Sequence, residues 1–414
     1  MKNKILAHLD NPGQLERLYR SNSASFKKEF IALYPSIKDK PFSEFWIERL
    51  NHDTETISWG SKKELWFIGF ACIVAGLLAK FPSIFSLNEE FYYPLNLGLI
   101  VFPLLIAFFS WKNKLSLKNK TIIGVIIAIS AVFINLWPGE AESDTLILAC
   151  IHLPLLLWVI LGAAFTGNQI NNHQKRLDFL RFNGDLVVMT AILAISGMLL
   201  SGITIGLFEL IGLKIEQFYM QNVVIFGLPS IPIVATFLNY SNPHLVNKVS
   251  PIIAKIFSPV VLLMLIIYLG AIAFSGKNPY TDREFLLLFN LLLIGVMALI
   301  FFAVAESVQK VKTNFGIWVL LLLSIVTIIV NGIALSAIIF RISEWGFTPN
   351  RLAVLGSNIL ILIHLLMVTS ILFKTVQQKS DVSNVGTVIA KYIPIYFIWT
   401  VVVVFIFPLI FGFN

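Results

Sequence analysis

Residues 315–340 read FGIWVLLLLSIVTIIVNGIALSAIIF and contain no Asp, Glu, Lys or Arg. A helix needs about 20 consecutive apolar residues to cross the hydrocarbon core of a bilayer. The run is continuous, whereas a strand of a membrane barrel alternates apolar and polar residues. This stretch therefore predicts a membrane-spanning α-helix.

The same pattern recurs along the chain, which has 414 residues, 57% of them hydrophobic and 13% charged. Soluble domains are typically about 45–50% apolar and about 25% charged. The shortage of charge excludes soluble globular, disordered and collagen-like proteins. The apolar runs predict an all-α, polytopic helical membrane protein with about eleven transmembrane helices. The predicted spans are residues 65–81, 95–111, 121–138, 145–166, 185–213, 221–239, 251–274, 285–305, 315–340, 352–373 and 393–412.

The Lys and Arg residues predict how the spans are oriented. With the N-terminus in the cytoplasm, 25 of the 31 fall in cytoplasmic segments and 6 on the opposite face, as the positive-inside rule requires. An odd number of spans then places the C-terminus, Asn414, outside. The net charge of +8 reflects cytoplasmic loops beside anionic lipid, so the expected partner is the bilayer and not nucleic acid.

Residues 1–63 are polar, with apolar residues at helical spacing. Asn11-Pro12 predicts the start of one helix, residues 26–34 a second and residues 43–50 a third. Three short helices bury too little apolar surface for a robust core of their own. We expect a small cytoplasmic module at residues 1–63 that packs on itself and on either a protein partner or the membrane domain, residues 64–414.

Two neighbouring spans are unusual in their small residues and prolines. Gly202 and Gly206 form a GxxxG pair in the fifth span, which predicts close packing of another helix. The sixth span contains Gly227, Pro229 and Pro232, and each proline removes a backbone donor, so we expect a kink or break. A broken helix at that depth either lines a substrate or ion site or is an inert packing kink.

A few ionisable residues lie inside or near spans. Glu209 and Glu306 lie close to span ends, where an interfacial position competes with a role as a substrate or ion ligand. His152 and His364 lack metal-ligand spacing, so we expect hydrogen-bonded packing roles and no metal site. Amides in or near spans fit either interhelical hydrogen bonds or substrate contacts, and they are Asn135, Asn290, Asn331 and Asn358.

The loop RISEWGFTPNR, residues 341–351, is the densest polar motif on the predicted outer face. Arg341 and Arg351 bracket Glu344, and Thr348-Pro349 predicts the cap and first turn of the tenth span. Two arginines beside a helix N-terminus suit an anion or a lipid headgroup. In the alternative interpretation Glu344 neutralises an arginine and the loop is a rigid turn.

Catalytic motifs are absent from the sequence. It contains no GxxxxGK[ST] phosphate loop, no GxSxG elbow and no paired-carboxylate cluster. Cys72 and Cys150 lie in apolar runs, which argues against a disulfide. We therefore predict no catalytic residue and no cofactor, and an enzyme is not the favoured class.

Several strings resemble a bacterial multi-pass membrane family known as domain of unknown function 4153. They are LERLYRSNSASFKKEFIALYP and FWIERL near the N-terminus, then RFNGD, FELIGL, VVIFGLPSIPIVATFL and EWGFTPNRLAVL, with FGLP and GxTPNR the most specific parts. The resemblance implies a recurring architecture that contains Glu209, the Pro229 region and the Arg341–Arg351 loop. It also implies the bacterial cytoplasmic (inner) membrane as the location, and no particular activity.

Three functions fit these observations. The favoured one is a secondary transporter or permease of a small solute or ion, in a sharper form with spans one to five and six to ten as inverted repeats. The second is a non-catalytic membrane partner or sensor that docks a protein through residues 1–63. The third is a lipid-handling enzyme with an extracytoplasmic headgroup site, for which Glu209 and Glu344 are the available acids.

Overall fold

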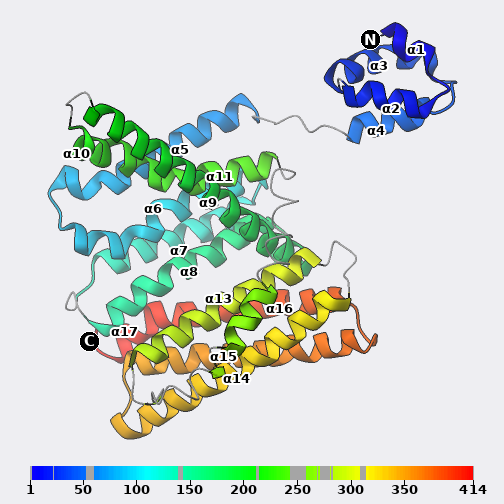
Figure 1. Ribbon diagram of the computed structural model, residues 1–414. Helices are drawn as coiled ribbons and strands as arrows, with labels where there is room; N and C mark the ends of the chain where they lie inside the picture. The colour runs from blue at the N-terminus through cyan, green and yellow to red at the C-terminus, as the bar shows by residue number, and fades with distance from the viewer. Residues whose placement is uncertain are drawn as a thin grey trace. The chain divides into compact units, whose positions relative to one another are not determined.

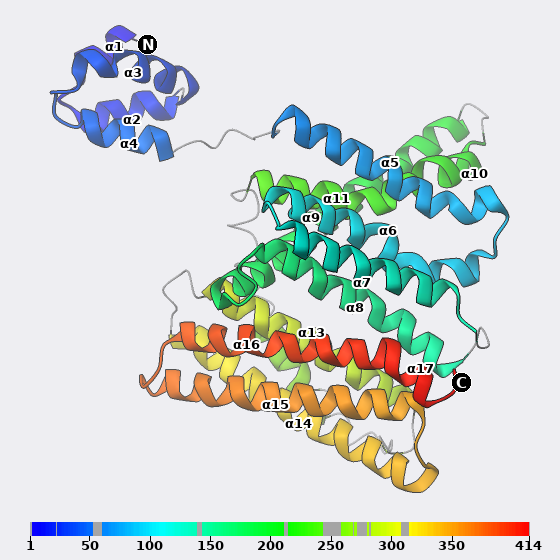
Figure 2. The same cartoon turned by 180° about the vertical axis from the view of Figure 1, so that it is seen from behind.

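The computed structural model describes residues 2–21, 23–52, 60–138, 143–210, 214–242, 258–267, 269–270, 280, 283–307 and 314–413. The chain divides into two compact units, Met1–Ser58 and Trp59–Asn414. Throughout the described ranges all regular structure is helical (Figures 1 and 2).

The N-terminal unit consists of α1 (Lys2–Ala7), α2 (Pro12–Ser21), α3 (Ser23–Ile37) and α4 (Ser43–His52). The last three are the helices predicted from the sequence, and α1 is an addition. Phe26 and Phe30 of α3 are buried, and their ring centres lie 5.1 and 6.2 Å from that of Trp46 in α4. The unit therefore has an apolar core in which three large rings concentrate buried surface in few residues. The expected packing of these helices on one another is confirmed.

The second unit contains the long apolar helices. Its elements are α5 (Lys62–Phe85), α6 (Glu89–Lys112), α7 (Leu117–Asn135), α8 (Asp144–Thr166), α9 (His173–Leu210), α10 (Glu216–Tyr219), the π-helix η1 (Met220–Val224), α11 (Ile225–Ser241), α13 (Arg283–Ser307), α14 (Asn314–Trp345), α15 (Pro349–Val376), α16 (Val382–Val401), the π-helix η3 (Val402–Ile406) and α17 (Phe407–Ile410).

Within the described residues, nine helical segments are long and apolar enough to cross a membrane. They coincide with nine of the predicted spans. The predicted span 285–305 falls in α13, which contributes a shorter apolar stretch, Phe289–Ala305. Half of the predicted span 251–274 lies outside the described residues, and the described half includes the helical segment Ser258–Ile267. The all-helical, membrane-compatible fold is therefore confirmed, and the count of eleven stays a prediction.

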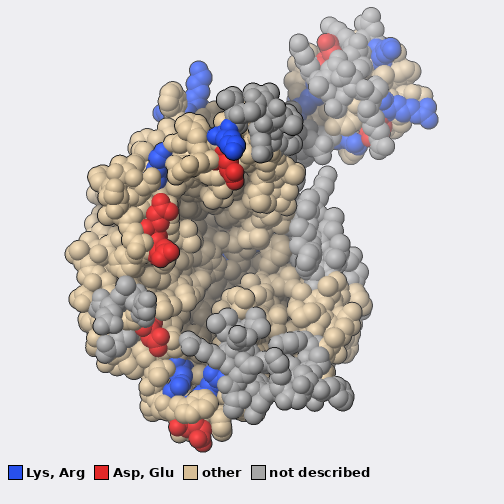
Figure 3. Space-filling view, turned by 60° about the vertical axis from the view of Figure 1, so that its left-hand side comes forward, with Lys and Arg blue, Asp and Glu red and all other residues tan. Residues whose placement is uncertain are grey.

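The exterior of the second unit is apolar, as α5 illustrates. Trp66 and Phe70 point outward and are 81% and 66% exposed, whereas Ala71 and Ala75 are buried. Large apolar side chains outside and small ones between helices is the arrangement expected when the solvent is lipid. Over the face shown in Figure 3, most of the described surface is likewise neither acidic nor basic.

Spans one and six lie side by side. Their contacts pair Cys72 with Ser230, Gly76 with Phe226 and Lys80 with Asn222. Each step moves one helical turn forward in α5 and one turn back through α11 and η1, so the two helices are antiparallel. A Cβ on Gly76 would lie 2.0 Å from the Phe226 ring, so only glycine permits this approach.

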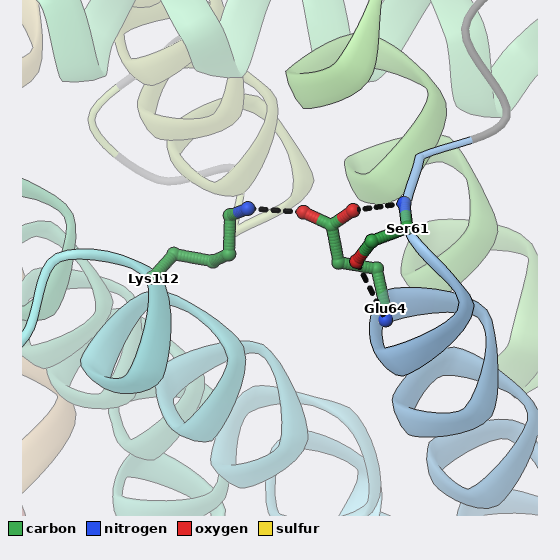
Figure 4. A network of polar contacts seen from close by, with 3 residues as sticks. All are labelled: Ser61, Glu64 and Lys112. Carbon is green, nitrogen blue, oxygen red and sulfur yellow. Dashed lines mark hydrogen bonds and ion pairs between the residues drawn. The ribbon is translucent and has the colours of Figure 1, made fainter.

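A polar network joins one end of α5 to the end of α6 (Figure 4). The Glu64 carboxylate accepts hydrogen bonds from the Ser61 backbone N–H and from Lys112 Nζ, while the Ser61 hydroxyl accepts from the Glu64 N–H at 3.3 Å. The Lys112 ammonium also lies 4.9 Å from the centre of the Tyr240 ring in α11. This capping box and ion pair therefore tie three helices together.

Two expectations about helix boundaries need correction. The fifth span was expected at 185–213, but α9 begins at His173. Leu177, Phe179 and Leu180 are buried in this first part of the helix, and the charged residues around them interrupt the apolar run. Of the kink or break expected at Pro229 and Pro232, the break is wrong, since α11 runs unbroken through both prolines. The irregular turn lies upstream in η1, and each proline removes only its own N–H donor.

The unit has two main apolar cores. One draws its residues chiefly from α5, α6, α8 and α11, and the other from α13, α14, α15 and α16. Figure 2 shows α14, α15 and α16 side by side in the second group. The second core also contains buried polar side chains, among them Asn331 of α14 and His364 of α15.

Candidate functional site

The residues proposed from the fifth span all lie on α9, and they are Gly202, Gly206 and Glu209. At Gly202 no described heavy atom lies within 4 Å of the position that a Cβ would take. The surroundings of Gly206 and the side chain of Glu209 fall outside the described residues. The close helix approach and the ligand role assigned to them thus stay predictions.

The residues proposed from the sixth span lie on α11. Gly227 is exposed, and a Cβ there would meet no described atom within 4 Å. Pro229 and Pro232 are half-buried in a continuous helix, and the hydroxyl of Ser230 between them donates to the Phe226 carbonyl at 2.6 Å. The prolines therefore do not create exposed helix ends, which was the main reason to place a site there.

The predicted outer loop brings its two arginines to one aromatic ring. The guanidinium carbons of Arg341 and Arg351 lie 5.9 and 5.7 Å from the centre of the Trp345 ring. Arg341 Nε donates to the Tyr280 carbonyl at 2.9 Å, and Arg351 Nη1 donates to the Trp345 and Gly346 carbonyls at 2.7 Å each. Arg351 therefore caps the C-terminal end of α14, where the helix carries partial negative charge.

Glu344, between the two arginines in sequence, is exposed. In the described part of the chain it forms no ion pair with either arginine. Thr348 caps α15 as expected, with its hydroxyl accepting from the Arg351 N–H at 3.3 Å. Backbone carbonyls and the tryptophan ring, rather than Glu344, hold the loop as a rigid turn.

A buried polar cluster lies where α15 meets α13 and α16. His364 of α15 has 0% exposure, and its Nδ1 lies 3.0 Å from the Tyr396 hydroxyl of α16. That hydroxyl also donates to the sulfur of Met297 in α13 at 3.4 Å. Hydrogen bonding at His364 agrees with the packing role expected from the sequence, but the partners come from two other helices.

Aromatic rings surround the His364 imidazole. The Tyr392 ring is stacked on it at 4.3 Å between ring centres, and the Phe301 and Tyr396 rings lie 4.7 and 5.6 Å away. The Tyr392 hydroxyl donates to the Leu360 carbonyl at 3.0 Å. These contacts fix the plane of the imidazole and exclude water from it.

Two buried amides extend the polar surface along α15. The Asn331 side-chain amide of α14 donates to the main-chain carbonyl of Asn358 at 3.2 Å. Among the described residues, Asn331 Oδ1, Asn358 Nδ2 and His364 Nε2 are buried with no hydrogen-bond partner. We call Asn331, Asn358, His364, Tyr392 and Tyr396 the central polar cluster.

The central polar cluster lies at mid-depth in the helices. At about 1.5 Å per residue, Asn331 is about 25 and 21 Å from the two ends of α14. On the same scale His364 is about 22 and 18 Å from the two ends of α15. An ionisable side chain at this depth is a functional candidate with a stated partner, here Tyr396.

Sequence reasoning recognised some members of this cluster and missed others. It assigned His364 a packing role, left Asn331 and Asn358 open between interhelical hydrogen bonds and substrate contacts, and did not notice Tyr392 and Tyr396. Their spacing of one helical turn in α16 was a signal that both rings share one face. Asp185, expected at the start of a span, was also missed as a buried carboxyl well inside α9.

Comparisons with protein-family models, with curated proteins and with solved structures give no match. The resemblance to the domain of unknown function 4153 family therefore stays a prediction. The long apolar helices and their apolar exterior define this chain as a multi-pass helical membrane protein.

Proposed function

We propose that this chain is a membrane permease or secondary transporter of a small solute or ion, with the central polar cluster in its pathway. The observation that carries the proposal is the unused hydrogen-bonding capacity of His364, Asn331 and Asn358 at mid-depth. Leaving a buried polar group unpaired costs about 1–3 kcal/mol. Water or a passing polar solute would remove that cost, whereas a purely structural bundle is more stable with apolar residues there.

The packing of spans one and six supports the sharper form of this proposal. In two inverted five-helix repeats these spans occupy corresponding positions and run in opposite directions. The antiparallel contact of α5 with η1 and α11, which includes the Lys80–Asn222 hydrogen bond, has that relationship. We propose the cytoplasmic N-terminus, the outside C-terminus and the bacterial inner membrane on the distribution of Lys and Arg and on the family resemblance.

The experiment that tests the pathway is cysteine labelling in membrane vesicles. In a Cys72→Ala, Cys150→Ala background, Asn358→Cys is exposed to a membrane-impermeant charged thiosulfonate in inside-out and right-side-out vesicles. A pathway makes Asn358→Cys reactive from at least one side, because a charged reagent reaches only wetted positions. The matched control is Leu365→Cys on the same helix, whose native side chain has 0% exposure.

The control should stay unreactive from both sides. If Asn358→Cys is as unreactive as Leu365→Cys in both vesicle orientations, the cluster is not part of a pathway. Labelling of Leu365→Cys at the same rate would indicate general loosening of the bundle, and would also count against a defined route.

A second candidate function has support from the N-terminal unit. Its compact fold around Trp46 suits a module that docks a protein partner. The lipid-handling alternative has less support, because Arg351 donates hydrogen bonds to the Trp345 and Gly346 carbonyls at the end of α14. Recovery of the same partner by the full chain and by a chain lacking residues 1–58 would argue against the docking function.

A further inference from the structure

We propose that His364 is a proton-binding site, vacant in this closed state, and that its protonation opens the bundle around the central polar cluster. The inference rests on the proposed function and names the proton as its coupling ion. It is carried by the buried Nε2 of His364, which has no hydrogen-bond partner among the described residues, and by the aromatic rings around the imidazole.

The proton of the neutral imidazole can lie on Nδ1 or on Nε2, and Tyr396 and Met297 lie on the Nδ1 side. A thioether sulfur accepts hydrogen bonds and cannot donate them. The Tyr396 hydroxyl has a single proton, and its oxygen lies 3.0 Å from His364 Nδ1 and 3.4 Å from Met297 Sδ. We assign the Nδ1–H tautomer, in which Tyr396 directs its proton to the sulfur and Nε2 presents a bare lone pair.

That lone pair is a base without a partner. His364 has 0% exposure, and within the described residues Nε2 meets no hydrogen-bond donor. No group of His, Cys, Asp and Glu side chains suited to a metal ion occurs in the described ranges. The ligand that fits an isolated, enclosed imidazole nitrogen is a proton.

The groups packed around the imidazole determine how stable its neutral and protonated forms are. Its titratable neighbours are Tyr392 and Tyr396 of α16, while α13 contributes Met297 and Phe301. From the other packed helices, α14 brings Asn331 to Asn358, and α8 brings Leu148 to the Ala353 region, one turn from the start of α15. No charged side chain of the described residues acts on the imidazole.

Protonation of His364 places a positive charge and a new hydrogen-bond donor in this apolar packing. One proton adds to Nε2, forming an N–H bond, and the imidazole becomes a cation with no other bond broken. The rings of Phe301 and Tyr392 stabilise that cation in part. The new Nε2–H donor has no acceptor in the closed arrangement, so the protonated form favours a state in which water or a polar solute reaches it.

The first arm of the test reads the proton directly. Full-length protein with ¹⁵N-labelled histidine, in lipid bilayers, is examined by solid-state NMR from about pH 8 to about pH 5. A through-space contact with a tyrosine Cζ identifies His364 without any substitution. We expect protonated Nδ1 and bare Nε2 at the higher pH, and protonation of Nε2 as the pH falls.

The second arm reads opening by labelling Asn358→Cys with the thiosulfonate at each pH. Rates are normalised to Leu117→Cys, whose native side chain is 81% exposed, to remove the intrinsic pH dependence of thiols. One proton coupled to opening changes the open fraction by up to about tenfold per pH unit. We expect the normalised rate to rise on acidification, His364→Gln to abolish the rise, and His152→Gln in α8 to leave it unchanged.

The two arms separate failure of this inference from failure of the proposed function. A His364 that carries its proton on Nε2 at about pH 8, or stays neutral across the range, overturns the proton site. Labelling that is present but independent of pH keeps the pathway and removes the proton as the coupling ion. If His364→Gln does not fold, the spectra and labelling rates of the chain with His364 intact still decide between these results.

Discussion

Gly76 of α5 lies so close to Phe226 of α11 that a Cβ on the glycine would be 2.0 Å from the ring. This contact sets how closely spans one and six approach each other. Phe226 belongs to the FGLP string and lies in the first turn of α11, two residues after η1 ends, and Asn222 of η1 accepts a hydrogen bond from Lys80 of α5.

Replacing Gly76 with Ala should destabilise the bundle by about 1–3 kcal/mol, because an added methyl group in a packed contact forces the ring or the helix to move. The measurement is the unfolding free energy of the purified protein in detergent. Gly69→Ala is the matched control on the same helix, since a Cβ there meets no described atom within 4 Å. Equal stability of the two variants would contradict the contact.

Replacing Asn331 with Leu should leave the stability within about 1 kcal/mol of the native value. The variant loses one interhelical hydrogen bond, worth about 0.6 kcal/mol on average in membranes, and also removes an unpaired buried oxygen. The same substitution should make Asn358→Cys unreactive toward the thiosulfonate. If Asn358→Cys is labelled at an undiminished rate in the Asn331→Leu background, Asn331 is not part of the pathway.

Replacing Arg351 with Lys should loosen the turn between α14 and α15, although the charge is kept. A lysine lacks the planar guanidinium group that lies over the Trp345 ring while its Nη1 donates to two carbonyls. Amide hydrogen exchange at residues 345–351 should therefore become faster. Glu344→Gln serves as the control and should leave exchange unchanged; faster exchange in that variant would assign Glu344 a structural role.

Replacing Trp46 with Ala should unfold the N-terminal unit, because removing a fully buried tryptophan typically costs about 3–5 kcal/mol. The readout is protease resistance of residues 1–58 in the full-length protein. Phe45→Ala is the matched control, since Phe45 is the neighbouring residue and is 61% exposed. Resistance that survives Trp46→Ala would show that the unit does not depend on this core.

Much of the fold followed from local pattern. Uninterrupted apolar runs predicted nine of the spans, because each such helix must satisfy its own backbone hydrogen bonds in lipid, whatever it packs against. The start of α9 at His173 was missed, since its buried leucines and polar residues form a pattern without a long apolar run. The break expected at Pro229 was wrong because the neighbouring turns retained their hydrogen bonds.

The candidate site depended on contacts between distant residues. His364, Asn331 and Asn358 are visible in the sequence as polar residues in apolar runs, and the Arg341–Arg351 loop as two arginines around a carboxylate. Nothing in these runs indicates that His364, Tyr396 and Met297 form one chain of polar contacts, or that Arg351 bonds to carbonyls and not to Glu344. Such partners are separated by tens of residues along the chain.

The sequence by itself determined that this chain is a helical membrane protein, where most of its helices lie and which residues in them are polar. Only the tertiary structure decided which of those polar groups are paired and which are buried with bonding capacity unused. The reason is physical: transfer into lipid depends on the composition of each run separately, whereas a hydrogen bond depends on two groups that folding brings together.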